Sequence, residues 1–152
     1  MKKIIFLFII LYIIPSISFA CSCILYSSDP NKAVKAKYND FSSIVLAKAE
    51  SIKKIEINTS WTKEINFKNK GEETYFSSVQ SWKGDHGKKF HTKVITESTM
   101  CGTRFVTGET YLLFLSRSKK GGYYTTSSCS GNIGLSQAKE HIRALNKLSP
   151  NN

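Results

Sequence analysis

Acidic residues and known catalytic motifs are both scarce in this chain. It holds 11 Asp and Glu against 22 Lys and Arg, which gives a formal net charge of +11. No HExxH, GxSxG or phosphate-binding loop occurs, and His86, His91 and His141 fall on a loop, a strand and a helix of the expected structure. Nothing in the pattern pairs Glu97 with Glu109 as a general acid and base. The sequence therefore predicts a protein that is not an enzyme and has no cofactor.

The chain also lacks an apolar run long enough to cross a membrane. The apolar stretch at 4–14 follows two lysines and is shorter than the roughly 20 residues of a spanning helix. Ser18 and Ala20 are the small residues that a signal peptidase requires before its cleavage site. We therefore expect residues 1–20 to be a signal peptide and residues 21–150 to be one domain, either secreted or periplasmic.

Cleavage after Ala20 would make Cys21 the first residue of the exported protein. A bacterial lipoprotein also begins at a cysteine, but it has an aliphatic residue three positions earlier and a small residue two positions earlier. Here those positions hold Ser18 and Phe19. Lipidation of Cys21 and an uncleaved membrane anchor are the two alternatives to a free amino terminus.

The positive charge is spread along the chain. Removing residues 1–20 takes away two lysines and no acidic residue, so the formal charge falls from +11 to +9. The lysines stand singly between polar and aromatic residues, without a run of five or six. A basic surface favours acidic partners such as polysaccharide, nucleic acid or anionic lipid, although it is common in secreted proteins that have no such partner.

All four cysteines, Cys21, Cys23, Cys101 and Cys129, lie in the expected exported part. An even count in a small exported domain predicts two disulfides. A Cys21–Cys23 bond would close a very tight ring, which disulfide geometry disfavours. Both other pairings tie the N-terminus to the segments around Cys101 and Cys129, through loops of about 80 to 110 residues that would each stabilise the fold by roughly 4 kcal/mol. Zinc binding by four thiolates is the rival interpretation, although the spacing has no CxxC pair.

Helix signals stand near both ends of the expected domain. Asp29 is a plausible N-cap and Pro30 suits the first helical position, so a short helix should begin there and end near Asn39. Between residues 134 and 148 apolar side chains recur at helical spacing, which predicts an amphipathic helix at the C-terminus.

Five stretches between these helices have the alternation or continuous apolarity of strands. They are residues 41–57, 75–82, 90–96, 110–116 and 123–128. Residues 58–73 should form a long connection or a protruding hairpin tip. Because no βαβ alternation occurs, the pattern predicts an all-β fold with flanking helices. The natural candidate is the five-stranded antiparallel oligonucleotide/oligosaccharide-binding (OB) barrel, followed by the C-terminal helix.

A free amino terminus at Cys21 would suit metal binding. The reference pKa of an α-amino group is about 8, so proton loss on meeting a metal costs little. The amine nitrogen and the carbonyl oxygen of one residue can grip a metal ion from two sides. A catalytic zinc keeps an open position for water, and a rigid amino terminus delivered there would displace the water and stop the enzyme. The side chain of Ser22 would then point toward the neighbouring substrate pocket.

These features resemble the tissue inhibitors of metalloproteinases, specifically their N-terminal inhibitory, netrin-like domain. The resemblance covers nearly all of the expected exported chain. The matching stretches are 21–23, 44–49, 82–84, 97–102, 111–114, Cys129 and 135–138. The third disulfide of the family's N-terminal domain and its cysteine-rich C-terminal domain are missing, and Ile24-Leu25 departs from the family pattern. The resemblance implies a single-domain relative with an OB-type barrel, and the Ile-, Lys- and Asn-rich composition suggests a bacterial source.

The resemblance implies a disulfide pairing and a set of contact residues. Cys21 would pair with Cys101, and Cys23 would pair with Cys129. Cys21 would chelate the zinc ion of the target, and the protein would hold no metal of its own. The other protease contacts would be Ser22, Cys23, Ser98, Thr99 and Met100.

Two functions follow from the sequence. The leading hypothesis is a monomeric secreted inhibitor of zinc metalloendopeptidases, acting through the Cys21 amine and carbonyl and binding no nucleic acid. The alternative is a non-inhibitory netrin-like module that binds polysaccharide or another envelope component, either free or lipid-anchored to a membrane at Cys21. In the alternative, Trp61, Tyr123 and Tyr124 could stack on the polymer.

Overall fold

The computed structural model describes residues 23, 26–60, 66–97, 101–119 and 121–149 of the 152-residue chain. The signal peptide expected at 1–20 lies outside these ranges. Within them, no helix combines the length and the apolarity needed to cross a membrane.

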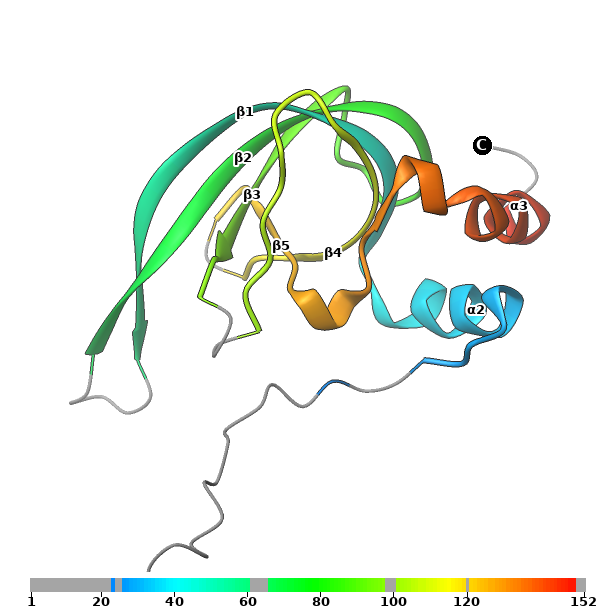
Figure 1. The fold of residues 1–152 in the computed structure, drawn as a ribbon, viewed down its shortest axis with the longest axis horizontal. Coiled ribbons are helices and arrows are strands. Elements are labelled where there is room, and N and C mark those ends of the chain that lie inside the picture. The colour runs from blue at the N-terminus through cyan, green and yellow to red at the C-terminus, as the bar shows by residue number, and fades with distance from the viewer. Residues whose placement is uncertain (1–22, 24–25, 61–65, 98–100, 120, 150–152) are drawn as a thin grey trace, which may run out of the picture.

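The described residues form one sheet with two helices beside it (Figure 1). The strands are β1 (Ser43–Ser60), β2 (Asn66–Lys83), β3 (Lys89–Ile95), β4 (Thr110–Arg117), β5 (Tyr124–Thr125) and β6 (Ile133–Gly134). They are ordered β1-β2-β3-β5-β4-β6, and β1 pairs with β4 as well as with β2. Strands β1 to β5 therefore close into a ring.

The ring closes because β1 pairs with a different strand on each of its two edges. Its residues 43–48 pair with 110–115 of β4, while its other edge pairs with β2 from Ile44 to Ser60. The register between β1 and β2 shifts at Leu46/Ala47 and again between Ala49 and Ser51. Such irregularities bend a strand and increase its twist, which allows β1 to curve from one side of the ring to the other.

Beyond the ring, β1 and β2 continue together as a two-stranded arm, seen at the lower left of Figure 1. The arm consists of residues 55–60 and 66–71, paired from Ile55↔Gly71 to Ser60↔Asn66. The sequence predicted a long connection or a hairpin tip at 58–73, and the hairpin is correct. Its strands are longer than predicted because the arm has few apolar residues and therefore shows little alternation.

Two apolar clusters lie on opposite faces of β1 and β4. The cluster inside the ring contains Val45, Ala47, Ala49, Phe76, Phe90, Val94, Phe105, Leu113, Leu115 and Tyr124. The cluster beneath the helices contains Val34, Ile44, Leu46, Trp82, Leu112, Phe114, Ala138, Ala144 and Leu145. Residues 112–115 of β4 are all fully buried because successive side chains enter different clusters, which explains the continuous apolar run in the sequence.

The first helix is the one that the sequence predicts. Helix α2 (Pro30–Asp40) begins where the Asp29 side chain accepts a hydrogen bond from the Asn31 N–H at 2.8 Å, with Pro30 in the first turn. The C-terminal helix is shorter than predicted: residues 135–137 form a separate 3-10 turn, and α3 (Lys139–Leu148) follows it. Helices α2 and α3 pack side by side (Figure 1).

The prediction of five antiparallel strands is wrong in its last member. The strand expected at 123–128 is only β5, which pairs antiparallel with β4 but in parallel with β3 through Thr92↔Tyr124, and β6 adds a sixth strand. The chain leaves the sheet after Thr125 because its hydroxyls find other partners. Thr126 Oγ1 donates to the Phe114 carbonyl at 2.9 Å, and the following serines cap a 3-10 turn.

Replacing Leu145 on α3 with alanine should weaken the packing of the helices on the ring. Leu145 is fully buried in the second cluster, so Leu145→Ala should lower the free energy of unfolding by about 2 to 5 kcal/mol. Urea titration followed by circular dichroism measures the loss. Leu148→Ala, on the same helix at a position 42% exposed, is the matched control and should change stability by less than about 0.5 kcal/mol. Equal losses in the two variants would contradict the packing.

Candidate functional site

Two short turns that carry cysteines form the candidate site. In the first, the Gly102 N–H donates to the Glu97 carbonyl at 3.0 Å and the Thr103 N–H donates to the Ile95 carbonyl at 3.1 Å. Gly102 passes so close to this backbone that an added Cβ would lie 2.6 Å from the Glu97 oxygen. The turn therefore requires glycine after Cys101, which accounts for the Cys-Gly pair in the sequence.

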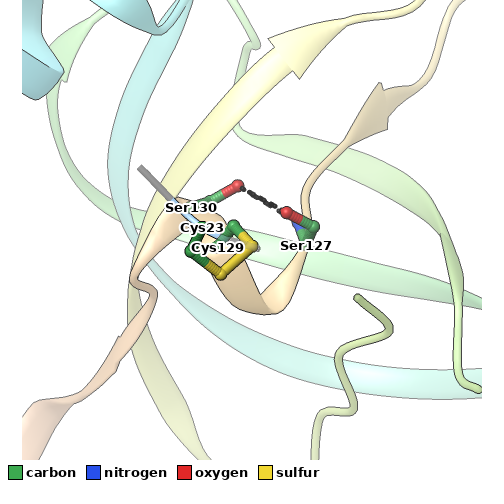
Figure 2. Close-up of a disulfide and its surroundings, with 4 residues drawn as sticks. All are labelled: Cys23, Ser127, Cys129 and Ser130. Carbon is green, nitrogen blue, oxygen red and sulfur yellow. Dashed lines mark hydrogen bonds between the residues drawn. A yellow bond between two sulfur atoms is a disulfide. The ribbon is translucent and has the colours of Figure 1, made fainter. Parts of the chain in front are cut away.

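The second turn is the 3-10 helix η2 (Ser128–Ser130), which contains Cys129 (Figure 2). The Ser127 N–H donates to Ser130 Oγ at 3.1 Å, and the Ser130 N–H donates back to the Ser127 carbonyl at 3.1 Å. The two hydroxyl oxygens lie 3.4 Å apart. Gly131 ends η2 in the left-handed conformation (φ 66°). These serines hold the turn in one conformation.

One backbone hydrogen bond joins the two turns. The N–H of Ser128 donates to the carbonyl of Cys101 at 3.0 Å. Cys101 has φ 55°, and across the described ranges it is the one residue other than glycine with a positive φ. A cysteine seldom adopts this left-handed conformation, so the surrounding structure must hold it there. The half-cystines at 101 and 129 are therefore neighbours.

The disulfides attach the N-terminal segment to these turns. Cys23 is bonded to Cys129, with their Cα atoms 5.0 Å apart and a sequence separation of 106 (Figure 2). This is the pairing that the resemblance implies for Cys23. Cys101 is disulfide-bonded too, and none of the cysteines at described positions is free. The partner expected for it, Cys21, lies outside the described residues.

The four-thiolate zinc interpretation is wrong, because the sulfur atoms of Cys23 and Cys129 are bonded to each other. Over the ranges that the structure describes, no three His, Cys, Asp or Glu side chains are grouped so as to hold a metal ion.

Most of the predicted contact residues lie outside the described ranges. They are Cys21, Ser22, Ser98, Thr99 and Met100. The structure does describe Cys23, which follows Ser22, and Glu97 and Cys101, which flank residues 98–100. Cys23 is attached to η2, and Glu97 and Cys101 belong to the turn that is hydrogen-bonded to η2. The two predicted contact segments are thus anchored at adjacent points.

The sequence interpretation missed Lys37, a buried residue of α2 whose side chain is hydrogen-bonded to the residue that ends η2. Only 5% of Lys37 is exposed, and its Nζ donates to the Gly131 carbonyl at 3.1 Å. The same ammonium lies 4.2 Å from the centroid of the Phe114 ring and 5.2 Å from that of Tyr26. Burial lowers the pKa of Lys37 to about 8. The one available signal was its spacing of three and four residues from the buried Val34 and Ala33.

A hollow of about 380 Å³ lies beside the disulfide. Its lining combines the Cys23–Cys129 bond with the rings of Tyr26 and Phe41 and with serine hydroxyls. The hollow lies next to the attachment point of the N-terminal segment.

No protein-family model matches this chain, and no curated protein matches its sequence. The function is therefore inferred from the two cysteine turns and the segments attached to them.

The buried ammonium of Lys37 should make stability depend on pH. Its pKa in the folded protein, about 8, lies below the ordinary value of 10.5, so the unfolded chain binds more protons between these limits. The contribution of Lys37 to stability should therefore rise with pH across this window, by about 2 kcal/mol between pH 7 and pH 10. Lys37→Met removes this titration, so stability relative to the wild type should fall by that amount as the pH is raised. Urea unfolding at both pH values measures it.

Lys35→Met is the matched control, because Lys35 is exposed on the same helix. Its stability should run parallel to the wild type from pH 7 to pH 10. If the Lys37→Met difference were also constant with pH, the lowered pKa of Lys37 would be refuted.

Proposed function

We propose that this chain is a secreted inhibitor of zinc metalloendopeptidases. The α-amino nitrogen and carbonyl oxygen of Cys21 would chelate the catalytic zinc ion of the target. The observation that supports the proposal is the hydrogen bond between Cys101 and Ser128, which makes neighbours of two disulfide-bonded turns. Cys23 is attached to one turn, and Cys21 is the cysteine of the sequence that remains for the other.

The proposed pair of disulfides would make the amino terminus rigid. Cys21 and Cys23 are two residues apart, a span of at most about 7 Å. A disulfide adds only about 5 to 6 Å between Cα atoms, so the two anchors must lie close together, as the turns at 101 and 129 do. A terminus bonded at its first and third residues loses little conformational freedom on binding. The usual fraying of a chain end is thereby avoided.

A rigid terminal amine is suited to the open coordination position of a catalytic zinc. The amine loses its proton at little cost near neutral pH, and it would displace the water that the enzyme activates. Ser22 would then extend into the adjoining substrate pocket. Ser98, Thr99 and Met100 would form a second contact ridge, anchored at both ends in the turn that bonds to η2.

We further infer that the ring of strands is the OB barrel of the netrin-like domain. Strands β1, β2 and β3 pair consecutively, and β4 returns to lie beside β1, which gives the spatial order β4-β1-β2-β3. This order is that of a Greek key, and the OB fold is a five-stranded, partly open Greek-key barrel. The single β3–β5 bridge at Thr92 and Tyr124 would be the partly open seam.

Export through a signal peptide at 1–20 is part of the proposal. The Cys23–Cys129 disulfide supports it, because such bonds persist in oxidising compartments and are rare in the cytosol. Cleavage after Ala20 would leave the amine of Cys21 free. A lipid-anchored protein would instead carry an acyl group on this residue.

An alanine added before Cys21 should abolish inhibition without affecting the fold. The addition converts the Cys21 amine into an amide and moves the charged terminus one residue away from the zinc. The inhibition constant should therefore rise by at least about 100-fold, the equivalent of about 3 kcal/mol. It is measured against a panel of purified zinc metalloendopeptidases that cleave a quenched fluorescent peptide, with urea unfolding as the test of the fold.

The unextended protein, with Cys21 verified as its first residue by mass spectrometry, is the reference, and trypsin is the control enzyme that should stay active. Unchanged potency of the alanine-extended protein would refute zinc chelation. A mature N-terminus that carries an acyl chain would favour the lipid-anchored alternative instead.

A further inference from the structure

The outward face of β2 and β3 carries a second surface, made by residues that the inhibitor proposal does not use. Side chains alternate along both strands, so Phe76 and Phe90 point into the ring cluster while Tyr75 and His91 point outward. Tyr75 is directly opposite His91 in the register. The next outward-facing pair along these strands is Glu73 of β2 and Lys93 of β3.

Three aromatic rings cross this face from β2 to the start of β5. The rings of Tyr75 and His91 are stacked with centroids 5.5 Å apart, and the ring of Tyr123 lies 6.2 Å from that of His91. The Lys93 ammonium lies 5.1 Å from the centroid of Tyr123. We call Tyr75, His91 and Tyr123 the ring ladder. Tyr75 is 43% exposed, so its ring is open to a ligand.

The ring ladder joins two open hollows into one track. Tyr75 and His91 line a hollow of about 440 Å³. Tyr123 lines a second hollow of about 490 Å³, together with Ile57 of the β1–β2 arm and Thr125 of β5. Tyr75 and His91, which line the first hollow, and Lys93, which lines the second, are all at outward-facing positions of β2 and β3. A track of this form suits an extended polymer built of ring-shaped units better than it suits one small molecule.

Cations outnumber available anions along this track. Its three carboxylates already have partners: Glu73 lies 3.3 Å from the Lys93 ammonium, Glu56 lies 3.4 Å from that of Lys68, and Glu50, which lines the first hollow, accepts a hydrogen bond from the Ser77 hydroxyl. Lys89 lines one of the hollows, and the exposed Lys53 of β1 is directly opposite Glu73 in the register with β2. A ligand that carries acidic groups would meet these cations without displacing the paired carboxylates.

We propose that this track binds an acidic polysaccharide, an extended chain of sugar rings that bear carboxylates. The ring ladder supplies flat aromatic surfaces against which the faces of the sugar rings pack, and the surrounding lysines pair with the carboxylates. This activity is independent of Cys21 and of the cysteine turns. It would hold an exported protein in a matrix or envelope while its amino terminus stays accessible.

The aromatic residues of the track differ from those that the sequence suggested. Tyr124 is not available for stacking, because it is 6% exposed and its hydroxyl donates to the Asp85 carbonyl at 3.1 Å. Trp61 lies outside the described residues. Tyr123 does line the track, and Tyr75 and His91 join it through the pairing of β2 with β3.

Affinity electrophoresis in gels that contain polygalacturonate tests the proposal. The double variant Lys53→Ser/Lys89→Ser should bind this polymer about tenfold more weakly than the wild type does. Its matched control is Lys139→Ser/Lys147→Ser, which removes the same charge from the exposed side of α3 and should keep the wild-type affinity within about twofold. Equal losses of affinity in the two double variants would mean that binding depends only on net charge. That result would overturn the proposal that the polymer binds along the track.

The aromatic arm of the test uses Tyr75→Ala/Tyr123→Ala, with Val79→Ala as the control because Val79 is exposed on the same strand as Tyr75. The tyrosine variant should lose about tenfold in affinity, and the control should lose none. Unchanged binding by a folded tyrosine variant would overturn the proposal. So would tighter binding to single-stranded DNA of equal charge than to polygalacturonate. The alanine-extended protein should bind the polymer normally, which keeps this test separate from that of inhibition.

Discussion

The Cys23–Cys129 disulfide is the constraint on which the candidate site depends. Its closed loop spans 106 residues, and in the chain-entropy model such a crosslink contributes about 4 to 5 kcal/mol. That is a large share of the roughly 5 to 15 kcal/mol that stabilises a typical domain. The bond acts through η2, which is held on one side by the Cys101 carbonyl and on another by the Lys37 ammonium. The N-terminal segment is thereby coupled to both the sheet and the helices.

Strand β4 provides the rigidity behind these turns. Its fully buried residues 112–115 supply both apolar clusters, one inside the ring and one beneath α2 and α3. The backbone of β4 also accepts the hydrogen bond of Thr126, just before η2. A turn fixed to such a strand moves little, and a wedge that must enter another protein's active site binds best when it is already ordered.

The two proposed surfaces differ in physical character. The cysteine turns are crosslinked by disulfides and joined by a backbone hydrogen bond. The ring ladder lies on an open sheet face beside the β1–β2 arm, with hollows on either side. The first arrangement suits one partner of defined shape. The second suits a repeating polymer, which can bind in many registers along the same track.

The sequence by itself determined what depends on near neighbours. The Asp29 cap, the start of α2 at Pro30 and the buried β4 all follow from local patterns, because capping and side-chain alternation involve residues close together in the chain. Only the tertiary structure decided the short parallel β5, the burial of Lys37 and the ring ladder. Each of these depends on contacts between strands or helices distant in sequence, and no local pattern encodes which side chains such contacts bring together.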